Sequence, residues 1–417
     1  MEYRRVDKTG WDVSALSFGC MRFKDDESAA IAVRKAIELG VNYFDVAPLY
    51  GGGTAEPRLA TGLKNLRDEA IVTAKSSPGN GGTELCDYAP EKGFGIRTAD
   101  EARRQIERSM QILGVDHLDM YQFWACHSEE VFVEGLKPGG FMEGVLKARD
   151  EGLFDYIGMT THSESAEIIH FIKDSPYEFD MVTLPLSPVN AGRGEAIEYC
   201  VSRGIGVIAM NPLGGGRLGR PVPILASVAA SLGCQSMIDA SLRYVAGYPG
   251  VTSALNGITL ADHAVQGVKA IARGPLPGGV GEQLVARLGE LYNSVNPRHL
   301  CTACGYCGQC PQGIEIPEVL DLYTGMLVPS LAQAARKAWD ARIASDASRY
   351  APATCTRCGQ CEAKCPNKIP VSELMAAAAA LRGVGVTHGV HLPGGNLASN
   401  HKQSLRCADI GIGDRSV

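Results

Sequence analysis

Two closely spaced runs of cysteine near the C-terminal end constrain this chain more than any other feature. The first run consists of Cys301, Cys304, Cys307 and Cys310, and the second consists of Cys355, Cys358, Cys361 and Cys365. A 4Fe-4S cluster needs four thiolates that converge on one small volume, and cysteines spaced in this way let one segment wrap around a corner of it. The spacing therefore predicts two 4Fe-4S clusters, and it makes electron transfer the first functional hypothesis.

The segment 297–370 resembles the bacterial two-cluster ferredoxins. In that family the fourth ligand of each cluster comes from the other run. The resemblance implies one cluster held by Cys301, Cys304, Cys307 and Cys365, and another held by Cys355, Cys358, Cys361 and Cys310. Two features depart from a minimal ferredoxin. The first run has two residues, not three, before its last cysteine, and a long helical stretch from Ile316 to Ser348 separates the runs.

Structural zinc and disulfides are the alternatives for these cysteines. A zinc site takes pairs of Cys-x2-Cys and has no use for three such steps in a row. The remaining cysteines are scattered along segments typical of a core or of loops: Cys20, Cys86, Cys126, Cys200, Cys234 and Cys407. Residues 1–10 lack the apolar core of a signal peptide, so we expect the chain in the reducing cytoplasm, where disulfides are rare.

Length and charge limit the partners. A chain of 417 residues predicts two domains, or one large domain with an appendage. The net charge of −6 argues against nucleic acid, because phosphate binding needs a basic face. We expect no membrane segment, since no apolar run approaches the length of a membrane span.

The first 270 residues or so alternate between apolar strand-like runs and amphipathic helical stretches. The expected strands are Ala15–Phe18, Val41–Asp45, Ala70–Ala74, Leu118–Phe123, Tyr156–Met159, Met181–Leu184, Gly206–Met210 and Val251–Leu255. Continuous apolar strands that alternate with helices indicate a parallel sheet, and eight such units predict an α/β fold of the (β/α)8 TIM-barrel type. A hairpin over Tyr3–Val13 is expected to close the floor. We expect the barrel over 1–272, a linker and connecting helix over 273–296, a smaller, mainly helical ferredoxin-like iron–sulfur domain over 297–382 and a tail over 383–417.

In a barrel the chemistry lies at the C-terminal ends of the strands. Asp45 ends the second expected strand, Tyr50-Gly51 follows it, and Lys75 ends the third. With the later run NPLGGGRL at 211–218, these residues resemble the aldo-keto reductase family, specifically its branch with a ferredoxin-like extension. The resemblance covers about residues 1–272.

The trio of Asp45, Tyr50 and Lys75 suits carbonyl reduction. Hydride transfer places negative charge on the carbonyl oxygen, which then needs a general acid, and free tyrosine titrates too high, at about 10. An ammonium at position 75 favours the phenolate form of a nearby tyrosine, and we expect Asp45 to hold Lys75 charged and in place. The alternative is that Asp45 and Lys75 form only a structural ion pair.

The fourth strand departs from the family pattern. The family places a histidine where this chain has Trp124, and His127 follows three residues later. His127 either reaches the site as a catalytic residue or is an exposed loop histidine. Trp124 is expected to form a wall of the substrate pocket together with Phe23 and Leu49.

Members of this family bind a nicotinamide cofactor, and the residues at the corresponding positions of this chain also differ from the family pattern. The resemblance assigns the nicotinamide contacts to Thr160, Thr161, Thr183 and Met210. Hydroxyl groups can hydrogen-bond a carboxamide, and methionine can pack on a ring face. The phosphates are expected along Pro212, Leu213, Gly214, Gly216 and Leu218, and at Asn256 and Gly257. The resemblance implies NADP or NAD as the cofactor. The glycines at 214, 216 and 219 also match a Rossmann fingerprint, but Pro221 and Pro223 exclude a long helix directly after them.

Three functions fit this sequence. The leading one is an oxidoreductase that reduces a small carbonyl, or oxidises the alcohol, with NAD(P)H and an electron-transfer protein as partner of the clusters. The second is a redox enzyme that receives its electrons from the clusters without nicotinamide. The third is an electron carrier or redox sensor whose barrel only binds.

Overall fold

The structure is a computed structural model, and it describes residues 1–79, 95–308 and 310–383. The chain forms two compact units, Met1–Arg287 and Leu288–Val417. The boundary between them falls within helix α11 (Val280–Leu291). The expected tail over 383–417 lies outside the described residues, except for Gly383.

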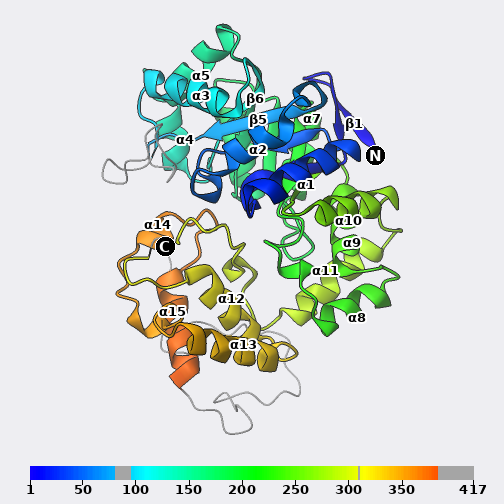
Figure 1. Ribbon diagram of the computed structural model, residues 1–417, viewed down its shortest axis with the longest axis vertical. Helices are drawn as coiled ribbons and strands as arrows, with labels where there is room; N and C mark the ends of the chain where they lie inside the picture. The colour runs from blue at the N-terminus through cyan, green and yellow to red at the C-terminus, as the bar shows by residue number, and fades with distance from the viewer. Residues whose placement is uncertain (80–94, 309, 384–417) are drawn as a thin grey trace. The chain divides into compact units, whose positions relative to one another are not determined.

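The first unit is a closed barrel of parallel strands in the order β10-β3-β4-β5-β6-β7-β8-β9 (Figure 1). These strands are β3 (Leu16–Gly19), β4 (Tyr43–Asp45), β5 (Ile71–Ser76), β6 (Leu118–Phe123), β7 (Phe154–Thr160), β8 (Met181–Pro185), β9 (Gly206–Met210) and β10 (Ser253–Gly257). Each overlaps a strand expected from the sequence, because buried parallel strands are continuous apolar runs with a clear local signal. The predicted TIM barrel is confirmed.

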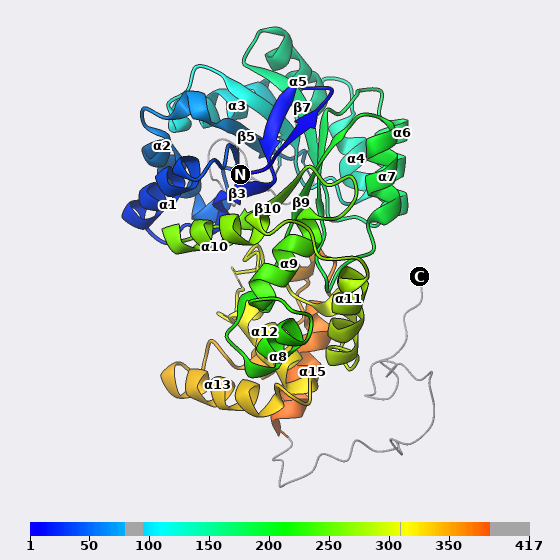
Figure 2. The same cartoon turned by 90° about the vertical axis from the view of Figure 1, so that its right-hand side faces the viewer.

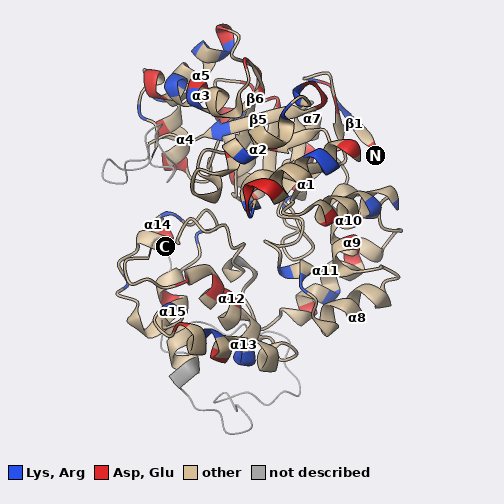
Figure 3. Cartoon of the chain, in the orientation of Figure 1, with Lys and Arg blue, Asp and Glu red and all other residues tan. Residues whose placement is uncertain are grey.

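Helices cover the outside of the barrel. In chain order, the α-helices of residues 1–272 are α1 (Asp26–Glu38), α2 (Ala55–Leu63), α3 (Ala99–Leu113), α4 (Glu129–Gly135), α5 (Phe141–Asp150), α6 (Ser165–Asp174), α7 (Gly194–Ser202), α8 (Pro223–Ser231), α9 (Met237–Ala246) and α10 (Ala261–Ala272). Helices α1, α2 and α3 lie on one side of the strands, and α4, α6 and α7 lie on the other (Figure 2). Lys, Arg, Asp and Glu residues are scattered over several of these helices (Figure 3).

Helix α3 shows how local chemistry sets a helix. Thr98 and Glu101 form a reciprocal capping box at its start, and Gly114 ends it in the left-handed conformation at φ 66°. Ala102 and Ile106 are fully buried on one face, at the spacing of a helical turn. The barrel buries this apolar face and leaves the charged face in water.

The expected hairpin at the barrel floor is present. Strands β1 (Tyr3–Val6) and β2 (Trp11–Ser14) pair in the antiparallel sense. Val6 and Val13 pack against inward-facing side chains of the barrel strands, among them Tyr43 and Met181. They close the barrel at the end opposite the carboxyl ends of its strands.

The second unit is mainly helical. Its helices are α12 (Ile316–Leu327), α13 (Ala332–Ser345), α14 (Gln360–Ala363) and α15 (Val371–Gly383). The expected helical stretch from Ile316 to Ser348 is two helices, since Pro329 lies between them and has no N–H to continue the first. Trp339 is fully buried in the core of this unit and donates a hydrogen bond from Nε1 to the carbonyl oxygen of Tyr350 at 3.2 Å. None of the described helices is long and apolar enough to cross a membrane.

A buried carboxyl group at the start of α2 gives the barrel unit a pH-dependent stability. Glu56 is 2% exposed, and its Oε1 has no hydrogen-bond partner among the described residues. Burial raises the pKa of Glu56 to about 7, although Ser109 and Arg108 oppose the shift. The folded state therefore binds this proton more tightly than the unfolded state. The free energy of unfolding therefore falls by about 1.4 kcal/mol per pH unit as the pH rises from the pKa of Glu56 in the unfolded chain toward its value of about 7 in the folded protein.

We expect Glu56→Gln to raise the melting temperature at pH 8 and to have little effect at pH 5, because the amide stays uncharged. Thermal unfolding followed by circular dichroism across this pH range measures the difference. The exposed Glu198 of α7 supplies the matched control, Glu198→Gln, which should show no such pH dependence. Equal effects of Glu56→Gln at the two pH values would contradict the shifted pKa.

Candidate functional site

The inward-facing side chains of the barrel form an apolar layer with a polar layer above it. Tyr43, Met120 and Met181 belong to the apolar layer that the hairpin covers. Successive residues of a strand alternate between the two faces of the sheet, so the residues two positions later point inward as well. These are Asp45, Gln122 and Thr183, and they lie toward the carboxyl ends of the strands.

Asp45 and Lys75 form a buried ion pair at these strand ends. Lys75 Nζ contacts Asp45 Oδ1, and the side chains are 1% and 2% exposed respectively. Burial lowers the pKa of Lys75, and the charge and hydrogen bonding of Asp45 oppose that shift. Burial, with the nearby charge of Asp45, raises the pKa of the Cys20 thiol beside this pair. The carboxylate of Asp45 thus stabilises the charged form of Lys75 at a position where water cannot solvate it.

Tyr50 and Trp124 lie over the lysine. The Nζ of Lys75 is 4.9 Å from the ring centroid of Tyr50 and 5.8 Å from that of Trp124. The two rings meet edge to face, with centroids 5.6 Å apart and an interplanar angle of 87°. Tyr50 is 8% exposed and Trp124 is 4% exposed. The structure therefore brings together four residues that the sequence selected separately.

A glycine-rich turn carries Tyr50 into the site. Tyr50 begins a short 3-10 helix, and Gly51, Gly52 and Gly53 follow with φ values of 63°, 66° and 90°. Glycine adopts this left-handed region at little cost, whereas other residues do not. The turn returns the chain toward α2 directly after Tyr50.

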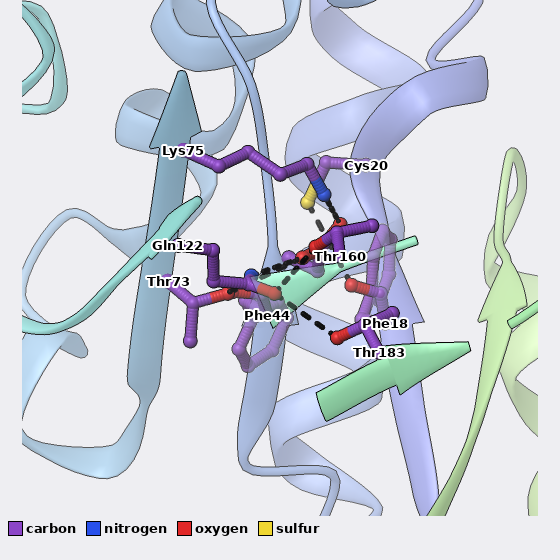
Figure 4. Close-up of polar contacts among 9 residues, drawn as sticks. Phe18, Cys20, Phe44, Thr73, Lys75, Gln122, Thr160 and Thr183 are labelled. Atoms are coloured by element: carbon purple, nitrogen blue, oxygen red, sulfur yellow. Dashed lines mark hydrogen bonds and ion pairs between the residues drawn. The ribbon is translucent and has the colours of Figure 1, made fainter. Parts of the chain in front are cut away.

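Gln122 lies at the centre of the polar layer (Figure 4). Its Nε2 donates to Asp45 Oδ2 at 2.8 Å and to Thr73 Oγ1 at 3.1 Å. Its Oε1 accepts from the hydroxyl groups of Thr160 at 2.7 Å and of Thr183 at 3.0 Å. Thr160 and Thr183, two of the three threonines expected to meet nicotinamide, therefore direct their hydroxyl protons toward Gln122.

The other expected pocket residues surround this layer. Thr161 is fully buried, and its Oγ1 accepts from the backbone N–H of Ser163 at 3.0 Å. Met210 ends β9 and is partly exposed. Phe23 is 7% exposed and packs on Phe18, and Leu49 is partly exposed.

The segment after Trp124 has an unusual backbone. Ala125 has a left-handed φ of 59°, a conformation that non-glycine residues adopt rarely. His127 lies beyond this bend, is partly exposed, and donates its backbone N–H to the carbonyl oxygen of Ala125 at 2.8 Å. The ring of Trp124 packs against that of Tyr50.

The loop after β9 is a tight glycine turn. Gly214, Gly215 and Gly216 have φ values of 57°, 72° and 94°. A three-residue 3-10 helix, Arg217–Gly219, follows, and α8 starts only at Pro223. This geometry differs from a Rossmann turn, in which a long helix opens at the last glycine. Pro212, Leu213 and Leu218 belong to the same loop, and Asn256 and Gly257 end β10 just before α10.

The cysteine runs surround a cavity in the second unit. The cavity encloses about 460 Å³, counting the part that is open to solvent. Apolar side chains line it together with the thiols of Cys307, Cys310, Cys355, Cys358 and Cys361. Burial raises the pKa of the Cys307 thiol, and the neighbouring thiols of Cys304, Cys301, Cys365 and Cys361 raise it further. Within the described residues, no three His, Cys, Asp or Glu side chains converge as they would on a single metal ion.

The two runs repeat one backbone conformation. Ala303 and Arg357, each two residues after the first cysteine of its run, have φ values of 51° and 56°. Gly305 and Gly359 follow the second cysteine of their runs with φ values of 83° and 75°, and a further left-handed residue comes three positions after the last cysteine of each run. Backbone N–H groups point at thiol sulfur, as from Ala303 to Cys301 at 3.3 Å. Such bonds tune cluster potentials, and the cysteine surroundings fit 4Fe-4S clusters.

Sequence reasoning gave no role to Gln122 or Thr73. A signal for Gln122 was present, because a glutamine within an apolar parallel strand and two residues before Trp124 must face the barrel interior. Its partners could not be read from the sequence, since they come from four positions on four other strands, β4, β5, β7 and β8.

Comparison with known proteins agrees with both parts of this geometry. Residues 15–280 match the aldo/keto reductase family, which is more than half of the chain, and residues 300–370 match the 4Fe-4S dicluster domain. L-galactose dehydrogenase from Arabidopsis thaliana is 28% identical over 301 residues, covering 65% of this chain and 88% of that protein. The 6-dehydroglucose reductase from Novosphingobium aromaticivorans is 25% identical over 263 residues, covering 59% and 80% respectively.

Solved structures show the same fold. The holo form of an aldo-keto reductase from Bacillus halodurans superposes with a TM-score of 0.57 at 21% identity, and the likeness covers 69% of this chain and 96% of that one. The chain belongs to the aldo/keto reductase family and is an oxidoreductase with a 4Fe-4S dicluster domain.

Proposed function

We propose that the protein reduces a small carbonyl compound with NAD(P)H, or oxidises the corresponding alcohol, with Tyr50 as the general acid or base. The observation that carries this proposal is the stacking of Tyr50 over the buried Asp45–Lys75 pair at the carboxyl ends of the barrel strands. A phenol, an ammonium and a carboxylate in this order can supply a proton to a carbonyl oxygen.

Each of the three residues has a distinct task. Tyr50 holds the proton that the carbonyl oxygen takes up as negative charge develops there. Lys75 favours the phenolate left behind, because a positive charge within about 5 Å stabilises it. Asp45 keeps Lys75 charged against the cost of burial. Trp124 packs on Tyr50, excludes water from one side and fixes the ring.

The residues present can accommodate a nicotinamide cofactor. The glycine turn at 214–216 and the segment before α10 offer backbone N–H groups for phosphates. Thr160 and Thr183 give their protons to Gln122, so each keeps an oxygen lone pair that can accept from a carboxamide N–H. When bound, the cofactor would supply a hydride to the carbonyl carbon.

The cysteines would hold two clusters in crossed sets, as the ferredoxin resemblance implies. The cavity contains Cys310 beside Cys355, Cys358 and Cys361, and Cys365 lies near Cys307. Cys358 is exposed, whereas the other seven are partly buried. An electron-transfer protein would reach the clusters at the side of Cys358, where the path through protein is shortest.

We expect Tyr50→Phe to lower kcat for carbonyl reduction by about 100-fold or more, because a positioned general acid contributes a factor of that order. NAD(P)H oxidation with a panel of aldehydes and ketones measures it. The control is Tyr156→Phe, which removes a hydroxyl group bonded to the floor hairpin and should leave turnover unchanged. Activity of Tyr50→Phe near that of the parent would rule out Tyr50 as the acid.

One observation favours a second candidate function. Thr160 and Thr183 are 2% and 1% exposed, and both hydroxyl groups already donate to Gln122, so neither has a proton left to donate to a nicotinamide carboxamide oxygen. The clusters would then deliver two single electrons from a reduced ferredoxin-type partner, and two protons would complete the reduction. Tyr50 would supply one of these protons.

Anaerobic titration of the purified protein separates the two candidates. The first function predicts turnover of carbonyls with NADH or NADPH alone. The second predicts turnover with dithionite or reduced ferredoxin and none with either nicotinamide. Bleaching of the cluster absorbance by NADPH would show, in addition, that nicotinamide electrons reach the clusters.

The crossed ligand sets predict how pairs of cysteine substitutions combine. Cys304→Ala with Cys365→Ala removes two ligands of one cluster, so iron should fall from about eight to about four atoms per chain. Cys304→Ala with Cys310→Ala removes one ligand from each cluster and should perturb both. Iron and sulfide analysis with electron paramagnetic resonance measures this. The opposite pattern would show that each run holds its own cluster.

A further inference from the structure

The amide of Gln122 has two sides, and each side is bound to a different part of the barrel. Gln122 is fully buried on β6, which leaves no water to satisfy it. Its nitrogen faces Asp45 and Thr73 on β4 and β5, and its oxygen faces Thr160 and Thr183 on β7 and β8. This one side chain thus connects five strands, β4 to β8 (Figure 4).

The charge on Asp45 fixes the direction of every bond in this network. An ionised carboxylate can only accept hydrogen bonds, so the nitrogen of Gln122 must face it. The oxygen of Gln122 then faces the threonines, and both hydroxyl groups must donate to it. The assignment of amide nitrogen and oxygen therefore follows from the chemistry of the partners.

The barrel makes room for this side chain. Gly158 of β7 lies opposite Gln122 of β6 in the strand register. A Cβ at position 158 would come within 2.8 Å of Gln122 Cγ and 3.0 Å of Met120 Sδ. A larger residue at 158 would push Gln122 out of line with Asp45.

The two carboxylate oxygens of Asp45 bind different partners. Oδ1 takes the ammonium of Lys75, and Oδ2 takes the hydrogen bonds of Gln122 and, at 3.4 Å, of Thr73. A buried ion pair costs desolvation energy, which it can avoid by passing the proton from lysine to carboxylate and becoming neutral. Hydrogen bonds to the ionised carboxylate oppose that transfer.

We propose that Gln122 is a positioning residue that holds Asp45 ionised and aimed at Lys75, and so keeps a charged ammonium beneath Tyr50. This inference rests on the proposed role of Tyr50. Gln122 touches no reacting atom in this account, and it acts only through Asp45 and Lys75.

Other titratable groups face the same pair. Cys20 comes from the turn after β3, Tyr43 lies one layer below on β4, and Tyr50 lies above. The pKa values of the Cys20 thiol and the Tyr43 phenol are raised, chiefly by burial, so both stay neutral through the neutral pH range. Asp45 and Lys75 are the groups whose charges Gln122 can shift there.

The test is the charge of Lys75 in the full-length protein with its clusters, read by nuclear magnetic resonance of lysine labelled at Cε and Nζ. Lys75→Met identifies the signal. In Gln122→Met, which keeps the length of the side chain and removes its polar atoms, we expect the apparent pKa of Lys75 to fall by about one unit or more. With an active carbonyl substrate, kcat should fall about tenfold while KM changes little.

A matched control exists on α3. Gln105 is likewise buried, at 1% exposure, and Gln105→Met makes the same chemical change away from the site. It should leave the Lys75 signal unmoved. If Gln122→Met does not fold, Thr160→Val with Thr183→Val removes the bonds that hold the amide oxygen, and should move the signal in the same direction by less.

An unchanged Lys75 signal in folded Gln122→Met, or an equal change in Gln105→Met, would overturn the proposal. The resonance measurement needs neither substrate nor nicotinamide, so it decides the role of Gln122 even if no carbonyl is reduced. Conversely, loss of turnover in Tyr50→Phe with no effect of Gln122→Met would leave the proposed function intact and remove this inference alone.

Discussion

The buried contact between the ammonium of Lys75 and the carboxylate of Asp45 is the interaction on which the barrel site depends. Each charge would be costly alone in a place that water does not reach, so each requires the other. The requirement extends outward: Oδ2 of Asp45 needs donors, which Gln122 and Thr73 provide, and Gln122 needs donors in turn, which Thr160 and Thr183 provide. Tyr50 lies on the opposite side of this network, over the ammonium of Lys75.

In the second unit, the groups that the backbone must position are the sulfur atoms of the cysteines. Its small core around Trp339 leaves the cysteine runs partly exposed, and the same left-handed positions recur in both runs. Two of those positions are held by Ala303 and Arg357, residues for which this conformation is unfavourable. A repeated strain of this kind points to a common requirement, which is to aim backbone N–H groups at the cysteine sulfurs, as Ala303 does at Cys301 and Ile369 does at Cys365.

Much of the barrel was predictable because its signals are local. Each strand is a short apolar run, each expected strand overlaps the strand found, and Asp45 and Lys75 lie at strand ends where the fold places chemistry. The helical stretch expected after Ile316 proved to be two helices. Periodicity alone defines such boundaries poorly when the covering surface is not known.

The sequence by itself determined that this chain has a parallel barrel, a Tyr–Lys–Asp set and eight cluster-spaced cysteines, because spacing along the chain encodes all three. Only the tertiary structure decided what Thr160, Thr183 and Gln122 do. Their meeting depends on the register of neighbouring strands, in which Lys75 pairs with Gln122 and Thr160 with Thr183. That register is set by side-chain fit between segments far apart in sequence, and Gly158 beside Gln122 is one of the places where the fit is made.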